Sequence, residues 1–220
     1  MNYQFNARGY TVHQVIVEMV RPQTRVLDIG CASGYVMAML RDKRGCHCTG
    51  IEIDYEAAKA AEREGFRVIV EPAARAVKRV PQLGPFDYVI FADVLEHLAD
   101  PDVVLRDSAR LLSGDGRVIV SLPNIVSLRA RLRILRGKWE YEDFGIFDRS
   151  HLRFYSIEGG RRLLATTGFK ILEQAYVGPL TFYGGRRLAP VTRALPGLLA
   201  NQMVFEAVAK RAPVDSSRRS

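Results

Sequence analysis

A glycine-containing loop between an expected strand and an expected helix is the first place where this sequence could do chemistry. An apolar strand containing Asp28 leads into Gly30 and Gly34, and residues 35–40 then have the composition of a helix. The glycines let the backbone approach a ligand closely, and the new helix presents unpaired N–H groups there. Glu52 ends the next apolar stretch, 22 residues after Gly30, where nucleotide-binding folds place a ribose-binding acid at about 20. This combination predicts a site for a nucleoside-containing ligand.

Four polar residues farther along the chain form a second candidate site. Asp93, Glu96 and His97 stand at positions i, i+3 and i+4, and they share one face if the chain turns into a helix at Asp93. His151 lies far along the chain, after a polar segment that contains several aromatic residues. A histidine close to carboxylates can take a proton from a substrate. These residues can equally be hydrogen-bonded structural groups, and the residues alone leave both interpretations open.

Short apolar strands alternate with helical segments, which is typical of a doubly wound α/β sheet. Strands are expected at residues 26–28, 46–53, 67–70, 86–92, 117–122, 169–176 and 202–210. Helices are expected at residues 11–20, 35–40, 55–64, 102–112 and 159–168. Thr11 is the expected cap of the first helix, and Pro22 ends that helix. Three prolines within residues 72–85 predict an irregular stretch there.

Four segments resemble the class I S-adenosylmethionine-dependent methyltransferases in their order and spacing. They are the glycine loop and residues 50–54, 86–97 and 112–117. Position 32 is alanine, so the loop has the pattern G-x-x-x-G instead of the dinucleotide fingerprint G-x-G-x-x-G. The resemblance covers roughly residues 20–175. It implies a Rossmann-like seven-stranded sheet with helices on both faces, parallel except for one reversed strand near the C-terminus.

The resemblance also implies that S-adenosylmethionine binds across the carboxyl ends of the first strands. The loop from Gly30 to Gly34 is expected to pack against the methionine part of the cofactor. Asp28 is expected to position that loop and the ammonium group, and Glu52 to accept both ribose hydroxyls. Ile53 is expected to cover the adenine. The implied cofactor-binding residues are Asp28, Gly30, Cys31, Ala32, Gly34, Glu52, Ile53 and Ala92.

The second site resembles the acceptor side of two O-methyltransferase groups, one acting on ubiquinone precursors and the other on the terminal ribose of small RNAs. In those groups a D/E-x-x-E-H motif and a distant histidine bind a divalent metal, which orients the acceptor hydroxyl and lowers its pKa. The corresponding metal-ligand candidates are Asp93, Glu96, His97 and His151. Such a mixed set suits Mg²⁺, Mn²⁺, Fe²⁺ or Zn²⁺. Metal-free relatives share the Glu-His pair, so His97 and His151 are also candidates for metal-free acid–base catalysis.

The net charge of +8 is concentrated in a few segments. Residues 125–138 contain five Arg or Lys and no acid, and residues 178–200 contain three arginines. Leu128, Leu132 and Leu135 share one helical face, which indicates either a core helix with a basic edge or a cap over the acceptor pocket. We expect both segments to contact anionic membranes peripherally, and the acceptor to be a small molecule or lipid-linked. Because the remainder is near neutral, we expect no nucleic-acid partner.

Length and composition favour a single soluble domain. The 220 residues are 48% hydrophobic and 25% charged, as in an ordinary soluble protein. Cys31, Cys46 and Cys48 predict free thiols in a reducing compartment, and the lack of a leader or an apolar span favours a cytoplasmic protein. We expect one methyltransferase domain over residues 1–210, with cap insertions at about 124–155 and 178–200. Residues 211–220 are expected to form a disordered tail.

The sequence therefore predicts an S-adenosylmethionine-dependent methyltransferase that methylates a hydroxyl of a small molecule, a sugar or a lipid-linked precursor. In this interpretation the chain mainly aligns the hydroxyl with the methyl group, and a base or a metal handles the hydroxyl proton. One alternative is an RNA ribose 2′-O-methyltransferase. Another is a non-catalytic, cofactor-binding partner subunit of a larger complex.

Overall fold

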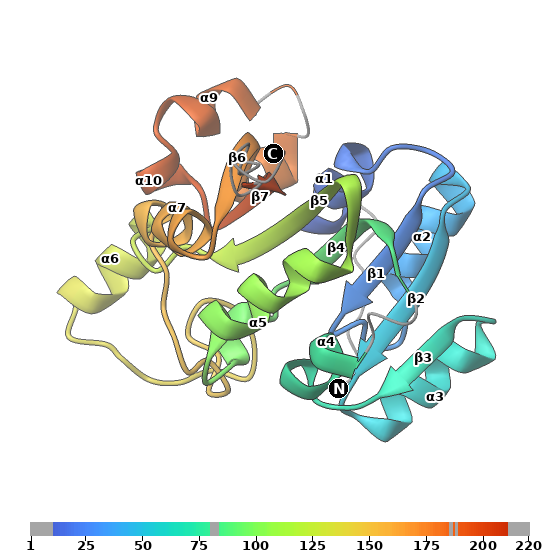
Figure 1. The fold of residues 1–220 in the computed structure, drawn as a ribbon. Coiled ribbons are helices and arrows are strands. Elements are labelled where there is room, and N and C mark those ends of the chain that lie inside the picture. The colour runs from blue at the N-terminus through green and yellow to red at the C-terminus, as the bar shows by residue number, and fades with distance from the viewer. Residues whose placement is uncertain (1–10, 80–83, 185–186, 188, 211–220) are drawn as a thin grey trace, which may run out of the picture.

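Seven strands form one continuous sheet in the computed structural model, which describes residues 11–79, 84–184, 187 and 189–210. The strands are β1 (Arg25–Ile29), β2 (His47–Glu52), β3 (Arg67–Val70), β4 (Phe86–Ala92), β5 (Leu112–Pro123), β6 (Phe169–Val177) and β7 (Gln202–Ala209). Their order is β3-β2-β1-β4-β5-β7-β6, and among these strands only β7 runs against the others (Figure 1). The expected seven-stranded sheet with one reversed strand near the C-terminus is confirmed.

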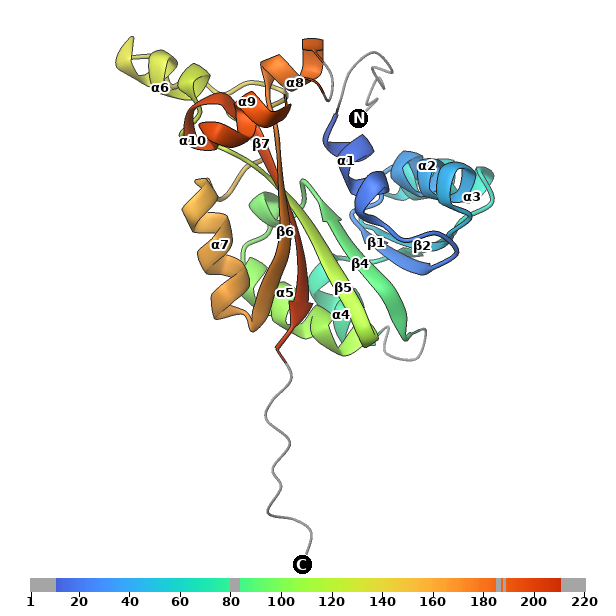
Figure 2. The same ribbon diagram turned by 90° about the horizontal axis from the view of Figure 1, so that it is seen from above.

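Helices cover both faces of the sheet, as expected for a doubly wound fold. One layer contains α1 (Val12–Met19), α2 (Tyr35–Arg44) and α3 (Tyr55–Arg63), and the other contains α4 (Ala73–Arg79), α5 (Pro101–Ser108) and α7 (Ile157–Thr166) (Figure 2). Strand β4 contributes core side chains to both faces of the sheet, because successive side chains of a strand point to opposite faces. Tyr88 and Ile90 pack in the cluster with α1 and α2, whereas Val89 and Phe91 pack in the cluster with α5 and α7. Burying a side chain such as Phe91 contributes about 1.5–3 kcal/mol.

The neighbouring positions of β1 and β4 determine where the functional loops lie. These two strands pair with each other although β2 and β3 come between them in the chain. The chain therefore winds outward in both directions from this pair, and a crevice forms at the carboxyl ends of the strands. The glycine loop follows β1, residues 53–54 follow β2, and residues 93–97 follow β4. All three segments consequently meet at one edge of the sheet.

Two regions fold differently from the sequence expectation. The stretch after β3 is not irregular throughout, because α4 begins directly after Pro72. Proline is tolerated there, since the N–H that it lacks has no partner in the first turn of a helix. The helix expected over residues 102–112 ends at Ser108, and a 3₁₀ turn over Ala109–Leu111 leads into a longer β5.

Four short helices gather beyond one end of the sheet, within the two segments expected to be insertions. They are α6 (Leu128–Leu135), α8 (Pro179–Gly184), α9 (Ala189–Ala194) and α10 (Pro196–Leu199) (Figure 2). Leu128, Leu132 and Leu135 are 40%, 39% and 81% exposed, so the interpretation of this segment as a core helix is wrong. Helix α6 extends away from the body of the molecule (Figure 1), and Ala130 is its one buried residue.

Other sequence expectations concern single features of the chain. Thr11 caps α1 through a capping box with Gln14, as expected for the first helix. All three cysteines are free thiols. In the part of the chain that the structure describes, no helix combines the length and the apolar character needed to cross a membrane. The tail expected over residues 211–220 lies outside the described residues.

One ion pair between β5 and β7 allows a test of the sheet. Glu206 is buried on β7, and its Oε1 accepts a hydrogen bond from Nη1 of Arg117 at 2.8 Å. Arg117→Met should cost about 1–3 kcal/mol in the free energy of unfolding, because it leaves a buried carboxylate without its cation. The double variant Arg117→Met/Glu206→Met should recover much of that loss. Urea unfolding measures both, and equal losses in the single and double variants would contradict the prediction.

Candidate active site

The glycine loop between β1 and α2 requires its two glycines. Gly30 and Gly34 have φ angles of +75° and +82°, in the left-handed region that favours glycine. A Cβ atom on Gly30 would also lie 2.5 Å from Cγ2 of Val94. The N–H groups of Gly30 and Cys31 both donate to the carbonyl oxygen of Ile51, at 2.7 and 3.1 Å. The loop is therefore a fixed turn, held against β2 at the crevice.

Glu52 joins the glycine loop to the start of α3. Its Oε2 accepts the N–H of Ala32 at 2.8 Å, and its Oε1 accepts the N–H groups of Ile53 and Asp54 at 2.8 and 2.9 Å. Hydrogen bonds to a charged group are worth about 1.5–3 kcal/mol each. Ile53 is 67% exposed beside this carboxylate, and Ala92, another expected cofactor residue, ends β4 half-buried. Glu52 is thus a structural anchor of the loop as well as a candidate ligand-binding residue.

Asp28 is a buried carboxyl group beneath the glycine loop. Neither of its oxygens has a hydrogen-bond partner among the described residues. Burial, and after it the negative charge of Glu52, raises the pKa of Asp28 to about 7. A buried polar group without a partner costs free energy, so this position favours a cationic group that would pair with it.

Glu96, His97 and His151 form a cluster at the end of β4. A 3₁₀ helix, Leu95–His97, carries the first two, and the loop after α6 carries His151. Their nitrogen and carboxylate ligand atoms lie within 4.8 Å of one another, and Oε1 of Glu96 is 3.9 Å from Nε2 of His151. Both carboxylate oxygens of Glu96 are buried without a hydrogen-bond partner among the described residues. Burial, and then the charge of Asp93, raises the pKa of Glu96 well above its ordinary value.

Backbone carbonyl groups select the tautomer of both neutral histidine rings in this cluster. Nδ1 of His97 lies 3.2 Å from the carbonyl oxygen of Ser150, and Nδ1 of His151 lies 3.2 Å from that of Ile146. A carbonyl oxygen only accepts, so Nδ1 carries the hydrogen in each ring and Nε2 keeps its lone pair. Asp148 supports this arrangement, since its Oδ1 accepts from the hydroxyl of Ser150 at 2.5 Å. Two Nε2 lone pairs and one carboxylate are a donor set that suits a divalent metal ion.

Asp93 does not join this cluster. Its Oδ1 accepts from Oγ of Ser121 and its Oδ2 accepts from Nε2 of Gln202, both at 2.8 Å. Its φ of +55° places it in a left-handed turn, so the helix expected to start at Asp93 does not form there. The structure therefore brings three of the four expected residues together and leaves Asp93 beside them.

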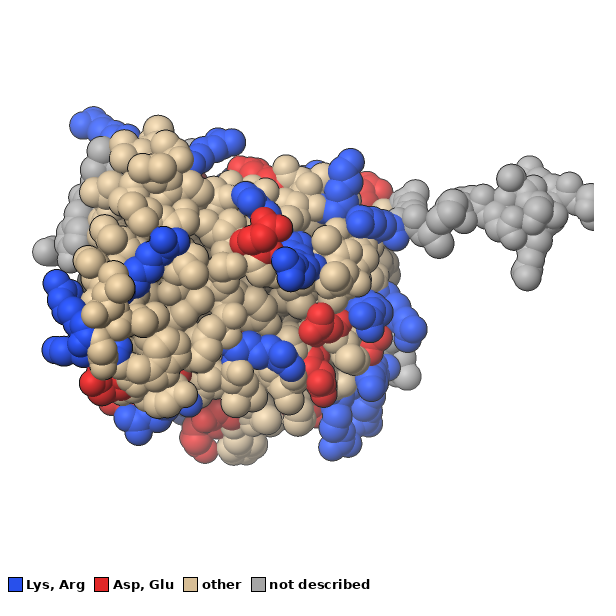
Figure 3. Space-filling model, turned by 90° about the vertical axis from the view of Figure 1, so that its left-hand side faces the viewer, with Lys and Arg blue, Asp and Glu red and all other residues tan. Residues whose placement is uncertain are grey.

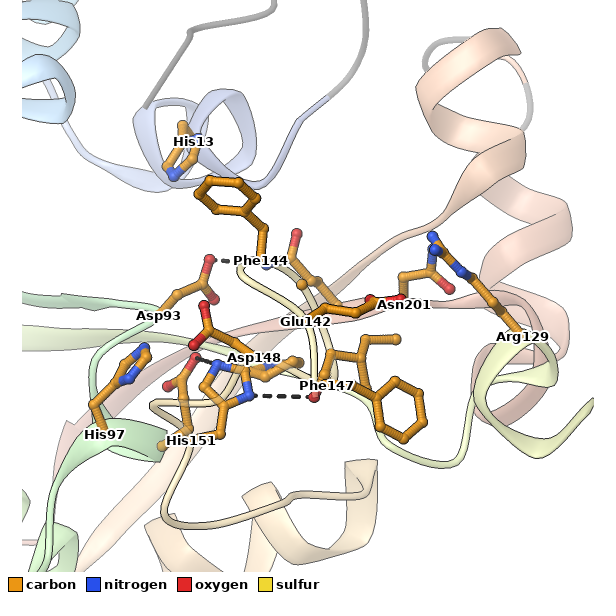
Figure 4. Close-up of a pocket in the computed structure, with 15 residues that line it drawn as sticks. His13, Asp93, His97, Arg129, Glu142, Phe144, Phe147, Asp148, His151 and Asn201 are labelled. Atoms are coloured by element: carbon orange, nitrogen blue, oxygen red, sulfur yellow. Dashed lines mark hydrogen bonds and ion pairs between the residues drawn. The ribbon is translucent and has the colours of Figure 1, made fainter. Parts of the chain in front are cut away.

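A cavity of about 340 Å³ opens beside the cluster (Figure 4). This is within the range of about 300–1,000 Å³ that is typical of small-molecule sites. His13 of α1 lines the cavity, although the sequence analysis did not single it out. Its ring packs edge-on against Tyr35 with centroids 4.5 Å apart, and burial lowers the pKa of His13, against the opposing effect of Asp93. A single histidine within an apolar helix belongs to no motif, so the sequence carried no signal for it.

Residues 11–207 match the model of the family described as methionine biosynthesis protein MetW. The chain belongs to this family. Among curated proteins, the MetW-family chain is 31% identical over 134 residues to a ubiquinone biosynthesis O-methyltransferase of Xylella fastidiosa, covering 54% of each chain. It is 33% identical over 134 residues to the protein of the same name from Bordetella avium, covering 54% of this chain and 55% of that one. The chain thus spans about half the length of the curated relatives it matches.

Solved structures show the fold of this MetW-family chain. A SAM-dependent methyltransferase from Archaeoglobus fulgidus aligns over 88% of this chain and 90% of its own, with a TM-score of 0.64 and 18% identity. A magnesium protoporphyrin IX methyltransferase from Synechocystis, solved with bound SAM, aligns over 90% of this chain and 78% of its own, with a TM-score of 0.57 and 18% identity. The expected resemblance to class I methyltransferases is confirmed.

One side of the cavity in this MetW-family chain is a loop, residues 139–150, anchored by Arg133 of α6. The Arg133 guanidinium pairs with the carboxylate of Glu142 and lies 4.4 Å from the ring centroid of Phe147. The Trp139 ring packs edge-on against Phe147, with centroids 5.2 Å apart. Arg133 thus ties α6 to the loop that leads into His151.

Arg133→Ala should loosen this loop without unfolding the sheet. The change removes a charged hydrogen bond and a cation–π contact, so the free energy of local opening should fall by about 1–2 kcal/mol, given the partial exposure of Glu142. Hydrogen exchange of residues 139–150 measures the effect. Arg136→Ala is the matched control, because Arg136 is an exposed residue of the same helix end. Equal protection of the loop in both variants would show that Arg133 does not anchor it.

Proposed function

We propose that this chain is an S-adenosylmethionine-dependent methyltransferase that transfers the methyl group to a hydroxyl of a small-molecule acceptor. The proposal is carried by one observation: the cluster of Glu96, His97 and His151 borders a cavity at the same sheet edge as the glycine loop. The curated relatives that are named O-methyltransferases support the reaction class. The fold shared with methyltransferase structures supports the cofactor.

The surroundings of the glycine loop fit S-adenosylmethionine. Asp28 offers an unpartnered carboxylate to the ammonium group, and exposed Ile53 offers apolar surface to the adenine. A carboxylate has about four acceptor positions, and Glu52 uses three of them on backbone N–H groups. One ribose hydroxyl can therefore hydrogen-bond to Glu52 without loss of these backbone bonds. Two ribose hydroxyls would require one of the backbone bonds to break. The proposed cofactor-binding residues are Asp28, Gly30, Cys31, Ala32, Gly34, Glu52, Ile53 and Ala92.

The cluster also fits a divalent metal ion. The buried carboxylate of Glu96 has no other partner among the described residues, and the rings of His97 and His151 each keep a lone pair on Nε2. We therefore propose these three residues as ligands, with Asp93 beside them, for Mg²⁺, Mn²⁺, Fe²⁺ or Zn²⁺. A metal bound there would supply Lewis acidity that lowers the pKa of the acceptor hydroxyl.

The chain itself would align the acceptor and handle its proton. Ser150 and Ile146 hold the two imidazole rings through their carbonyl groups, so each ring presents a basic Nε2. As the acceptor oxygen bonds to the methyl carbon, the methyl–sulfur bond breaks and the hydroxyl proton leaves. In the metal-free alternative, Nε2 of His97 or His151 accepts that proton.

Peripheral contact with an anionic membrane and a lipid-linked acceptor are finer proposals. Their support is the surface of α6, where Leu132 and Leu135 are exposed next to Arg131 and Arg136. Figure 3 shows Lys and Arg side chains around a broad uncharged area on the side of the molecule that carries α6. Apolar surface next to basic side chains is the composition that binds the headgroup region of anionic bilayers.

The pKa of Asp28 predicts that cofactor binding depends on pH. In the free protein Asp28 is largely protonated below about pH 7, whereas an ammonium group binds the ionised carboxylate. The affinity for S-adenosylhomocysteine should therefore rise as the pH increases from 5.5 to 7 and then level off, with proton release at the lower pH. Calorimetry in buffers of different ionisation heat measures both effects. Asp28→Asn should abolish the pH dependence, and an unchanged pH profile in that variant would remove Asp28 from the site.

Glu96→Gln should weaken metal binding while keeping the fold. The amide has the volume of the acid but lacks the charge that binds a cation, so the affinity for Mn²⁺ should fall at least about tenfold. Electron paramagnetic resonance of free Mn²⁺ measures the affinity, and exposed Glu158→Gln is the matched control. Equal Mn²⁺ affinity in the two variants would reject Glu96 as a ligand. Metal binding without methyl transfer to any hydroxyl compound would favour the non-catalytic, cofactor-binding alternative.

A further inference from the structure

The cavity has two chemically different ends. Glu96, His97 and His151 lie at one end, and Arg129 of α6 lines the same cavity on the side away from His97 (Figure 4). Phe144 projects from the loop between them. The histidine end is suited to a hydroxyl group, whereas a guanidinium favours an anion. The cavity therefore has the polarity expected for a molecule with different groups at its two ends.

Arg129 differs from the neighbouring arginines of its helix in having its guanidinium available. Nε of Arg131 donates to the carbonyl oxygen of Val126 at 2.6 Å, and Arg133 pairs with Glu142. Among the residues that the structure describes, no hydrogen bond or ion pair engages the side chain of Arg129. Its cationic donors are consequently free to bind a ligand in the cavity.

The carboxylates that line the cavity have other partners or lie at the other end. Glu142 is neutralised by Arg133, and Asp93 accepts hydrogen bonds from Ser121 and Gln202. Asp148 accepts the backbone N–H and the hydroxyl of Ser150. The contacts of these carboxylates therefore do not include an ion pair with Arg129.

Asn201 adds a second polar group on the side of Arg129. Its backbone groups bond to Asn124 and Val177, and Figure 4 shows its side chain on the side of the cavity away from His97. The lining also includes Phe144, whose ring offers apolar contact to the middle of a ligand. The cavity volume of about 340 Å³ restricts that ligand to a small molecule.

We infer that the acceptor carries an oxoanion, a carboxylate or a phosphate, at the end opposite its hydroxyl, and that Arg129 binds this oxoanion. The planar guanidinium presents paired N–H donors whose geometry matches both kinds of oxoanion. The assignment of the hydroxyl end rests on the proposed function. The assignment of the anionic end rests only on the cavity and on Arg129.

Calorimetry with S-adenosylhomocysteine-saturated protein tests this inference through two matched pairs of probes. 4-Hydroxycinnamate and its neutral amide differ only in the carboxylate, and 4-hydroxyphenyl phosphate and hydroquinone differ by the phosphate. At least one acid should bind the wild-type protein about tenfold or more tightly than its neutral counterpart, as expected for a charge-assisted hydrogen bond. The pair that shows the difference identifies the oxoanion.

Two variants test whether Arg129 causes the preference for the acid probe. Arg129→Ala should remove the preference for the acid, whereas Arg136→Ala removes the same charge from the end of the same helix and should keep it. Arg129 is exposed and should not be required for folding, and unchanged binding of S-adenosylhomocysteine checks this. Equal binding of acid and neutral probe, binding of neither, or an equal loss in both variants would overturn the inference. An Arg129-dependent preference without methyl transfer would instead contradict only the proposed function.

Discussion

The pairing of parallel strands β1 and β4 is the constraint on which the rest of the molecule depends. From β1 the chain moves outward through β2 and β3, and it must then return to the free edge of β1 as β4. The loops after β1 and β4 therefore leave the sheet toward opposite faces, with a crevice between them. Every residue with a candidate chemical role lies at this crevice or in a segment packed over it. A strand order that separated β1 from β4 would move the glycine loop and the histidine cluster apart along this edge of the sheet.

The buried carboxylates of the described residues divide into two groups. Glu206, Glu52 and Asp148 are compensated, the first by Arg117, the second by three backbone N–H groups and the third by the N–H and hydroxyl of Ser150. The carboxylates of Asp28 and Glu96 accept no hydrogen bond from the described residues, although Nε2 of His151 lies 3.9 Å from Oε1 of Glu96. An uncompensated buried acid destabilises the folded state, so its persistence indicates a role other than stability. These two acids lie in the two places proposed above for the cofactor and for a metal ion.

Sequence patterns predicted the parts of the structure that rest on local rules. The glycine spacing around Gly30 reflects a backbone conformation that few other residues adopt, and the alternation of strands and helices determines the sheet. The position of α6 could not be predicted from such rules, because the exposure of Leu135 depends on which residues lie opposite it in the folded chain. His13 was not predicted for a related reason, and Arg129 was predicted only as one of five basic residues in a segment that could cap the pocket. Each belongs to a common helix pattern, and only the folded chain shows that both line one cavity.

The loop over residues 139–150 gives the molecule a particular evolutionary constraint. The same few residues provide wall surface for the acceptor and position the imidazole of His151, through the carbonyl group of Ile146. Natural variation that reshapes this wall for a new substrate would also shift the imidazole that we propose as a metal ligand or base. Changes of specificity should therefore accumulate in α1 and α6, which line the cavity through His13 and Arg129 without carrying the cluster. Diversification of relatives by wholesale exchange of this loop would require compensating changes around His97.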